Sequence, residues 1–143
     1  MTVVLRQAAQ ADIAGMHRVR LAVKENRLSN PSRVTEADYR DAIEKFGRGW
    51  LIEIDGVIVA FAFGYTSDGN IWALFVDPEH EGKGYGKQLH GVMVDWLWSQ
   101  GMERLWLTTA TGSRAVGFYT ALGWQQRPMP ANGDAYFELT RSA

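Results

Sequence analysis

Apolar residues recur along this chain with two periods, one typical of helices and one typical of strands. Residues 2–8 predict a short opening strand, and Asp12 is a candidate N-cap for a helix that is expected to end near Asn26. A second helix is expected to begin at Thr35, whose pattern with Asp38 resembles a capping box, and to be ended by Gly47 and Gly49. Each helix has one apolar face: Ile13, Met16, Val19 and Val23 in the first, and Tyr39, Ala42, Ile43 and Phe46 in the second.

The middle of the chain predicts consecutive antiparallel strands. Residues 50–54 and 57–63 are rich in β-branched and aromatic residues, and Asp55-Gly56 separates them. This dipeptide suits a two-residue hairpin turn, because both central positions of that turn need a positive φ. A second polar turn precedes a third apolar run at residues 71–76. We therefore expect three strands in a row, joined by short turns.

The second half of the chain predicts two more helices and further short strands. A helix at residues 86–99 has a candidate C-cap in Gly101, and a shorter helix covers residues 115–122. The longer helix is expected to bury Leu89, Val92, Met93, Trp96 and Leu97. Short strands are expected at residues 104–108, 124–129 and 135–139.

This order of elements predicts an α+β fold with a mixed, mostly antiparallel central sheet flanked by helices, since strands and helices do not alternate strictly. The 143 residues fit one domain, and no linker or repeat divides residues 1–143. Charge is nearly balanced, with 15 Lys and Arg against 16 Asp and Glu, which gives no reason to expect binding to nucleic acid or to an anionic membrane. We expect a small molecule or a peptide as partner.

The chain contains no cysteine, which excludes a disulfide framework and a thiolate nucleophile and fits a cytoplasmic location. The N-terminus has no signal-peptide pattern, and the longest apolar stretch is too short to cross a bilayer. The three histidines are scattered without metal-ligand spacing, so no metal site is expected. Trp98 lies off the apolar stripe of its helix and is a candidate for exposure or for contact with a second copy in a homodimer.

The most informative segment is residues 72–89, which predicts a strand, a polar loop and a helix. Glycines at positions 82, 84 and 86 free the backbone where it enters the helix, so several N–H groups can converge on a phosphate. The spacing does not fit the dinucleotide fingerprint, because the third glycine comes one residue too early. It does not fit the Walker loop either, because Gln88 stands where that motif has Ser or Thr. A plain tight turn is the alternative interpretation.

Two motifs resemble those of the GNAT superfamily of acetyl-coenzyme-A-dependent N-acetyltransferases. One is Val76-Asp77-Pro78 followed by Gly82-Lys83-Gly84-Tyr85-Gly86, which is similar to the family's pyrophosphate signature. The other is Ala115 with Phe118-Tyr119, followed by Gly123-Trp124. Two positions depart from the pattern. Glu81 replaces a Gln or Arg, so its side chain is expected to point to solvent, and Gly112 replaces an Asn.

The resemblance implies a GNAT-like fold and the transfer of an acetyl group from acetyl-CoA to a primary amine of a small molecule or peptide, by direct attack on the thioester. A non-catalytic acyl-CoA-binding or regulatory module of the same fold is the alternative. The strand at residues 71–76 is expected to diverge from its neighbour and to pair with the cofactor arm. The residues implied in binding acetyl-CoA are Leu74, Phe75, Val76, Gly82, Lys83, Gly84, Tyr85, Gly86, Lys87 and Ser113.

By the same resemblance, Tyr119 is the candidate acid that protonates the leaving sulfur. Its unperturbed pKa of about 10 makes that transfer mildly uphill. An alternative interpretation makes Tyr119 one more aromatic residue of the core. Glu25 is the candidate base, and Glu25 and Asn26 are candidates for the acceptor side, because they fall in the segment that borders the acceptor pocket in relatives. A solvated surface residue is the alternative for Glu25.

Overall fold

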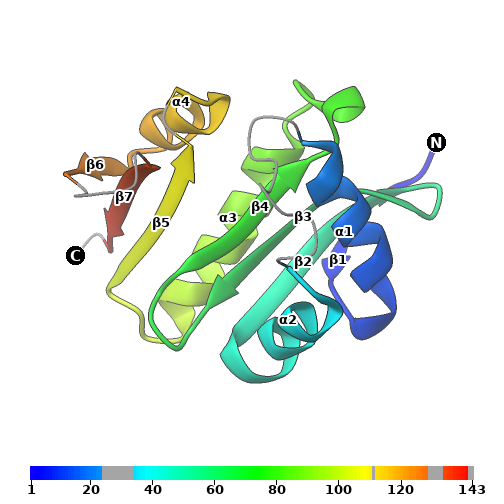
Figure 1. The fold of residues 1–143 in the computed structure, drawn as a ribbon, viewed down its shortest axis with the longest axis horizontal. Helices are drawn as coiled ribbons and strands as arrows, with labels where there is room; N and C mark the ends of the chain where they lie inside the picture. The colour runs from blue at the N-terminus through cyan, green and yellow to red at the C-terminus, as the bar shows by residue number, and fades with distance from the viewer. Residues whose placement is uncertain (24–33, 111, 129–133, 142–143) are drawn as a thin grey trace.

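The computed structural model describes residues 1–23, 34–110, 112–128 and 134–141. They form two antiparallel sheets with strand orders β1-β2-β3-β4 and β5-β7-β6 (Figure 1). The strands are β1 (Val3–Gln7), β2 (Gly47–Ile54), β3 (Val57–Tyr65), β4 (Ile71–Val76), β5 (Arg104–Ala110), β6 (Gln125–Arg127) and β7 (Asp134–Thr140). The helices are α1 (Ile13–Ala22), α2 (Glu36–Asp41), α3 (Tyr85–Ser99) and α4 (Arg114–Ala121), with short helical turns η1 (Gln10–Asp12), η3 (Ala42–Phe46) and η4 (Pro78–His80). The predicted α+β class is confirmed.

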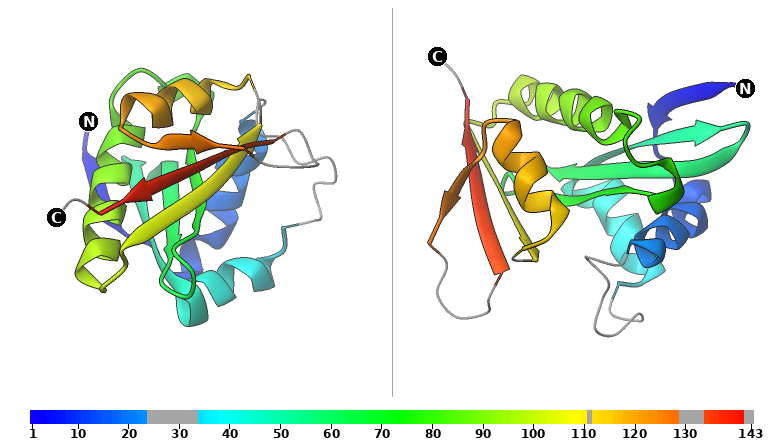
Figure 2. Two further views of the ribbon diagram at one scale, coloured as in Figure 1. Left: turned by 90° about the vertical axis from the view of Figure 1, so that its left-hand side faces the viewer. Right: turned by 90° about the horizontal axis from the view of Figure 1, so that it is seen from above.

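The first sheet is covered on both faces, with α3 on one and α1 and α2 on the other (Figure 2). This explains why β3 is buried over nearly its whole length. The α1 and α2 side packs around Met16, Val19, Tyr39, Phe61 and Phe63. The α3 side continues into the second sheet through Leu89, Met93, Leu105, Leu107 and Phe137. Most positions of the apolar faces predicted for the first two helices lie in this cluster, but Val23 and Phe46 do not. Phe46 is 39% exposed because it falls in the last turn before β2, where the helix has become π-helical.

The hairpin between β2 and β3 has the predicted primed turn. Asp55 and Gly56 have φ values of 50° and 83°, and Ile54 pairs with Val57 directly beside them. The predicted capping box is also present, since the Thr35 side chain accepts from the Asp38 N–H while the Asp38 side chain accepts from the Thr35 N–H. Both local signals act over a few residues, which is why the sequence predicts them well.

Strand β2 begins three residues earlier than predicted. A Cβ on Gly47 would lie 1.9 Å from the carbonyl oxygen of Gly64, and one on Gly49 would lie 2.3 Å from the Phe63 ring. These glycines therefore allow β2 and β3 to approach closely, and they lie within the strand rather than in a loop after the helix. The helix itself ends in a π-helical turn, η3, directly before Gly47.

Helix α3 buries a wider surface than one stripe. Val92, predicted to be buried, is 37% exposed, whereas Tyr85, His90 and Val94 are buried. The reason is that α3 packs against the first sheet and also against the junction of α4 and β6, where the His90 ring accepts a hydrogen bond from the Trp124 indole. Trp98 is half-buried and packs on the α3-side cluster, which leaves a homodimer as an untested prediction.

The two sheets meet at one end of β4 and β5 and separate toward the other end (Figure 1). Within the described residues they are joined by a parallel bridge between Asn70 and Trp106, where the Trp106 N–H donates to Gly69 over 3.0 Å. Beyond that bridge β4 pairs with β3 alone. The divergence that the resemblance implied is therefore present. In the described part of the chain, no helix combines the length and apolar character needed to cross a membrane.

Candidate active site

A cavity of about 480 Å³ lies where β4 and β5 separate. Its walls come from β4, from the loop that follows it, from the first turn of α3 and from α4, while the end of α1 reaches one side. The lining residues are Val23, Leu74, Phe75, Val76, His80, Glu81, Gly82, Gly84, Tyr85, Gly86, Lys87, Arg114, Ala115, Phe118 and Tyr119. The cavity therefore contains most of the residues predicted to bind acetyl-CoA, together with the predicted acid.

The glycines of the loop serve two different purposes. Gly82 and Gly84 have φ values of 76° and 84°, a conformation that strains other residues, while a Cβ on either would meet no atom within 4 Å. Gly86 has ordinary helical geometry and packs closely, since a Cβ there would lie 3.5 Å from the Phe118 ring and from Val76. The first two glycines thus set the backbone path, and the third lets α3 approach α4 and β4.

The first turn of α3 presents free backbone donors to the cavity. Gln88 donates to the carbonyl of Gly84 over 3.0 Å and is the first residue to close a helical turn. The N–H groups of Tyr85, Gly86 and Lys87 precede that bond, so they have no acceptor within the helix. Gly84, the N-cap, has no side chain to accept from them. This arrangement fits a pyrophosphate, which takes several hydrogen bonds at a helix N-terminus.

The side chain of Glu81 lies differently from the prediction. It does not point freely to solvent but forms an ion pair with Arg114, the first residue of α4. The Glu81 side chain is 33% exposed, and that of Arg114 is 67% exposed. The two residues are 33 positions apart in the sequence, so the pair depends on the way α4 packs beside the loop. The negative charge that the loop carries is offset by this arginine.

Two of the predicted cofactor-binding residues do not line the cavity. Lys83 is exposed and is not among the lining residues, so the contribution it can make from there is its positive charge. Ser113 is the N-cap residue of α4, and its hydroxyl lies 3.5 Å from that of Thr109. Their proposed contacts with the cofactor therefore remain predictions.

Tyr119 lines the cavity and also belongs to the core. Its side chain is 6% exposed, and its ring contacts those of Phe118, Trp124 and Phe137. Burial raises the pKa of the Tyr119 phenol above its ordinary value, since the phenolate would lose its hydration. The group is therefore protonated at neutral pH. Both interpretations of this residue are compatible, because a core tyrosine at a cavity wall can still present its hydroxyl.

Glu25 and Asn26, the predicted acceptor-side residues, lie outside the described residues. The described lining contains one carboxylate, Glu81, and one imidazole, His80, whose Nδ1 is buried without a hydrogen-bond partner. No group of three or more potential metal ligands occurs in the part of the chain that the structure describes.

Several lining residues have no role that the sequence predicted. Ala115 and Phe118 belong to the second motif and were recognisable by their helical spacing. Val23 was expected only as part of the apolar face of its helix, and His80 and Arg114 carry no such signal, since only the tertiary structure brings them to the cavity. Arg114 is the most informative of them because it pairs with Glu81.

Comparison with known proteins agrees with this geometry. The model of the Acetyltransferase (GNAT) family matches residues 17–124, more than half of the chain. No curated protein gives a significant match.

Solved structures of low sequence identity share the fold. The PaiA N-acetyltransferase of Thermoplasma acidophilum, in complex with coenzyme A, is 15% identical with a TM-score of 0.84, over 99% of this chain and 100% of that one. A Bacillus anthracis protein assigned as a streptothricin acetyltransferase, in complex with acetyl coenzyme A, is 16% identical with a TM-score of 0.76, over 98% and 100%. A GNAT-family acetyltransferase of Staphylococcus aureus Mu50 is 13% identical with a TM-score of 0.83, over 97% and 99%.

At such low sequence identities, the solved structures establish the fold alone. The family model establishes the family, because its match over residues 17–124 includes both motifs and the strands before the loop. The glycine loop, the divergence of β4 from β5 and the match over residues 17–124 agree. This chain belongs to the GNAT acetyltransferase family.

Proposed function

We propose that the protein transfers an acetyl group from acetyl-CoA to a primary amine of a small molecule or peptide, by direct attack of the amine on the thioester. One observation carries the proposal: the open first turn of α3 and Tyr119 line the same cavity. The proposal assigns the first turn of α3 to the phosphates and Tyr119 to proton donation, and their shared cavity supports both assignments. The complexes of related folds with coenzyme A and acetyl coenzyme A support the choice of cofactor.

In this proposal the backbone of Gly82, Gly84 and Gly86 binds the pyrophosphate, and Lys87 adds positive charge at the cavity wall. Beyond the bridge at Asn70, β4 has one edge without a strand partner in the described residues. Leu74, Phe75 and Val76 offer their backbone groups there to the extended arm of the cofactor. An N–H from this edge also stabilises negative charge on the acyl oxygen.

Bound acetyl-CoA supplies an acetyl group activated as a thioester. The amine forms the new C–N bond, the C–S bond breaks with its electron pair remaining on sulfur, and Tyr119 donates its proton to that sulfur. The raised pKa of Tyr119 keeps the proton available through neutral pH, although it makes the phenol a weaker acid. The amine loses its proton to Glu25 or to water, with Asn26 on the acceptor side. These reactants suit a cytoplasmic protein.

Replacing Tyr119 with Phe tests the role of the acid. We expect kcat to fall by about 100-fold, because a positioned proton donor contributes rate factors of this order. The dissociation constant for acetyl-CoA should change less than about twofold, since the ring remains in place. Thiol release across an amine panel measures kcat, and calorimetry measures the dissociation constant for acetyl-CoA. Tyr136→Phe is the matched control, since that hydroxyl pairs with Glu138 outside the cavity.

Unchanged turnover of Tyr119→Phe would exclude this tyrosine as the acid. The same assays separate the enzyme from the alternative, a non-catalytic acyl-CoA-binding or regulatory module. Such a module binds acetyl-CoA but releases no thiol with any amine. Absence of acetyl-CoA binding would contradict both functions.

A further inference from the structure

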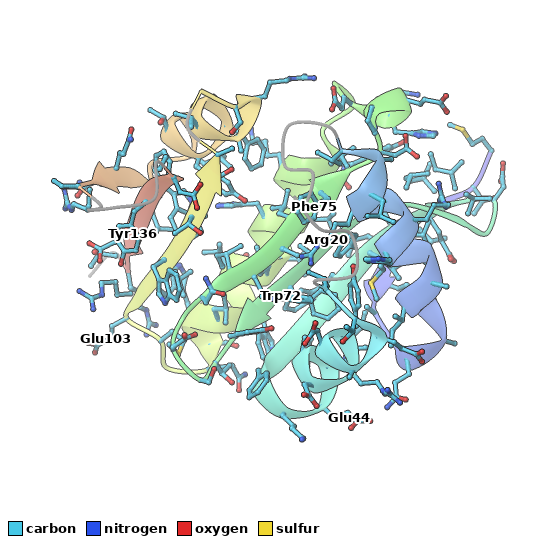
Figure 3. The ribbon with its side chains drawn as sticks, viewed as in Figure 1. Arg20, Glu44, Trp72, Phe75, Glu103 and Tyr136 are labelled. Carbon is cyan, nitrogen blue, oxygen red and sulfur yellow. The ribbon has the colours of Figure 1, made fainter. Side chains whose placement is uncertain are left out.

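Arg20 is a buried cation surrounded by aromatic rings. It lies in the last turn of α1 and is 4% exposed. Its guanidinium carbon lies 4.6 Å from the ring centre of Trp72, 5.0 Å from that of Phe75 and 5.7 Å from that of Tyr39. Figure 3 shows the side chain reaching from α1 to the middle of β4, between Trp72 and Phe75. All three distances are within the range of cation–π contact, and such contacts leave the N–H donors of the guanidinium without an acceptor.

Those donors have no protein acceptor among the described residues. The Nε atom is buried without a hydrogen-bond partner, and no described carboxylate forms an ion pair with the guanidinium. Asp38 is the one described acid whose charge acts on Arg20, alongside Tyr39 and Tyr65, and it does so without contact. Burial lowers the pKa of Arg20 from its ordinary value, because the buried positive charge loses its hydration and no contacting negative charge replaces it. A buried charge normally has a partner, so this group is available for one.

Arg20 adjoins the cavity through residues that both share. Phe75, on β4, has its ring against the Arg20 guanidinium, and the same residue lines the cavity. Val23, one turn after Arg20 at the end of α1, lines it too. Tyr119 approaches from α4, on the side of the α3 cluster, whereas Arg20 approaches from the α1 and α2 side. The two groups therefore lie on opposite sides of β4, the strand on which the proposed function places the thioester.

We infer that the acceptor is a small aminocarboxylate, whose carboxylate binds the guanidinium of Arg20 while its amine faces β4. This inference rests on the proposed function and names the substrate class. A carboxylate matches the planar edge of arginine with two parallel hydrogen bonds, and it compensates the buried charge. The aromatic rings leave little room around the guanidinium, which favours a compact anion on a small molecule.

Paired acceptors test the inference. Each pair is an amine with a free carboxylate and the corresponding primary amide: glycine, leucine, β-alanine and 4-aminobutyrate, with one to three carbons between the two groups. We expect at least one acid to be acetylated with a kcat/KM about 10- to 100-fold above that of its amide, the range expected for a hydrogen bond to a charged group. Dipeptides with an acidic or amidated second residue show whether a peptide carboxylate serves as well.

Arg20→Gln should abolish this preference, lowering kcat/KM for the acid to that for the amide while leaving the amide rate and acetyl-CoA affinity within about twofold. Arg20→Lys should recover only part of the preference, because lysine keeps the charge without the planar pair of donors. The matched control is Arg48→Gln. Arg48 also stacks on an aromatic ring, with its guanidinium carbon 4.7 Å from the Trp96 ring centre, but it does not line the cavity.

A binding measurement without chemistry completes the test. The Nε–H resonance of Arg20, assigned by its loss in Arg20→Lys, should shift on titration with the preferred acid and stay in place with its amide. Equal kcat/KM for every acid and amide, or a preference that survives in Arg20→Gln, would overturn the inference and make Arg20 a packing residue. Failure to acetylate any amine would instead contradict the proposed function.

Discussion

The pair formed by Glu81 and Arg114 changes how the loop is understood. Glu81 occupies a position where relatives carry Gln or Arg, and a carboxylate there repels a pyrophosphate. Arg114, which also lines the cavity, offsets that charge through a direct ion pair with Glu81. An exposed ion pair of this kind contributes little to stability, about 0.5 kcal/mol, so its effect is on the local field.

Glu81→Gln should therefore raise the affinity for acetyl-CoA by about two- to fivefold, because it removes one negative charge from the loop proposed to bind the pyrophosphate. Calorimetry at two salt concentrations measures the change, which should shrink at high salt. Glu79→Gln is the control, since it removes the same charge from an exposed residue of the same loop that does not line the cavity. A marked loss of affinity in Glu81→Gln would contradict this account.

At the scale of elements, α3 connects the loop to the core. Its N-terminus depends on the left-handed backbone at Gly84, and its body buries residues on two sides. Gly91, in the body, has ordinary helical geometry, and a Cβ there would meet no atom within 4 Å. The same helix thus contains one glycine that its conformation requires and one that it does not.

Alanine at these two positions should change stability in opposite directions. Gly84→Ala should lower the free energy of unfolding by about 1 kcal/mol, because L-residues are strained at positive φ. Gly91→Ala should raise it by about 0.5–1 kcal/mol through better helix propensity and a less flexible unfolded chain. Urea unfolding followed by circular dichroism measures both. Equal effects of the two substitutions would show that the backbone conformation at Gly84 is not strained.

At the scale of the whole molecule, His90 joins the two sheets. It lies on α3 and accepts a hydrogen bond from the Trp124 indole over 2.9 Å, directly before β6. Burial lowers the pKa of His90, and it also lowers that of His17, which contacts the Tyr39 hydroxyl on the other face of the first sheet. Neutral imidazole is therefore favoured in both core clusters.

Stability should therefore fall on mild acidification. A histidine whose pKa is lower in the folded state binds more protons in the unfolded state. Its contribution to the free energy of unfolding is therefore complete above the unfolded pKa of about 6.5, and it is lost as the pH falls from there through the folded pKa. The loss for each histidine is at most about 1.4 kcal/mol per pH unit. Urea unfolding between pH 7.5 and 5 measures it. His90→Gln keeps an acceptor for Trp124 and should give a shallower slope, whereas a flat profile in the parent protein would contradict the argument.

Much of the fold was predictable because its signals are local. The Asp55-Gly56 turn, the capping box at Thr35 and the glycines of the loop each require a particular backbone conformation within a few residues. The resemblance of the two motifs predicts that Tyr119 and the loop lie together, and both line the same cavity. The strand start at Gly47 and the exposure of Val92 were not predictable, since they depend on neighbours distant in the sequence.

The sequence by itself determined most of the elements, the class of fold and the position of the glycine loop, because periodicity, turn chemistry and glycine spacing are local properties of the chain. Only the tertiary structure decided which charges meet. Glu81 faces Arg114, and Arg20 lies among aromatic rings without a described partner, since both arrangements depend on how separate elements pack across β4. Electrostatic interactions depend on distance and burial, which no spacing along the chain specifies.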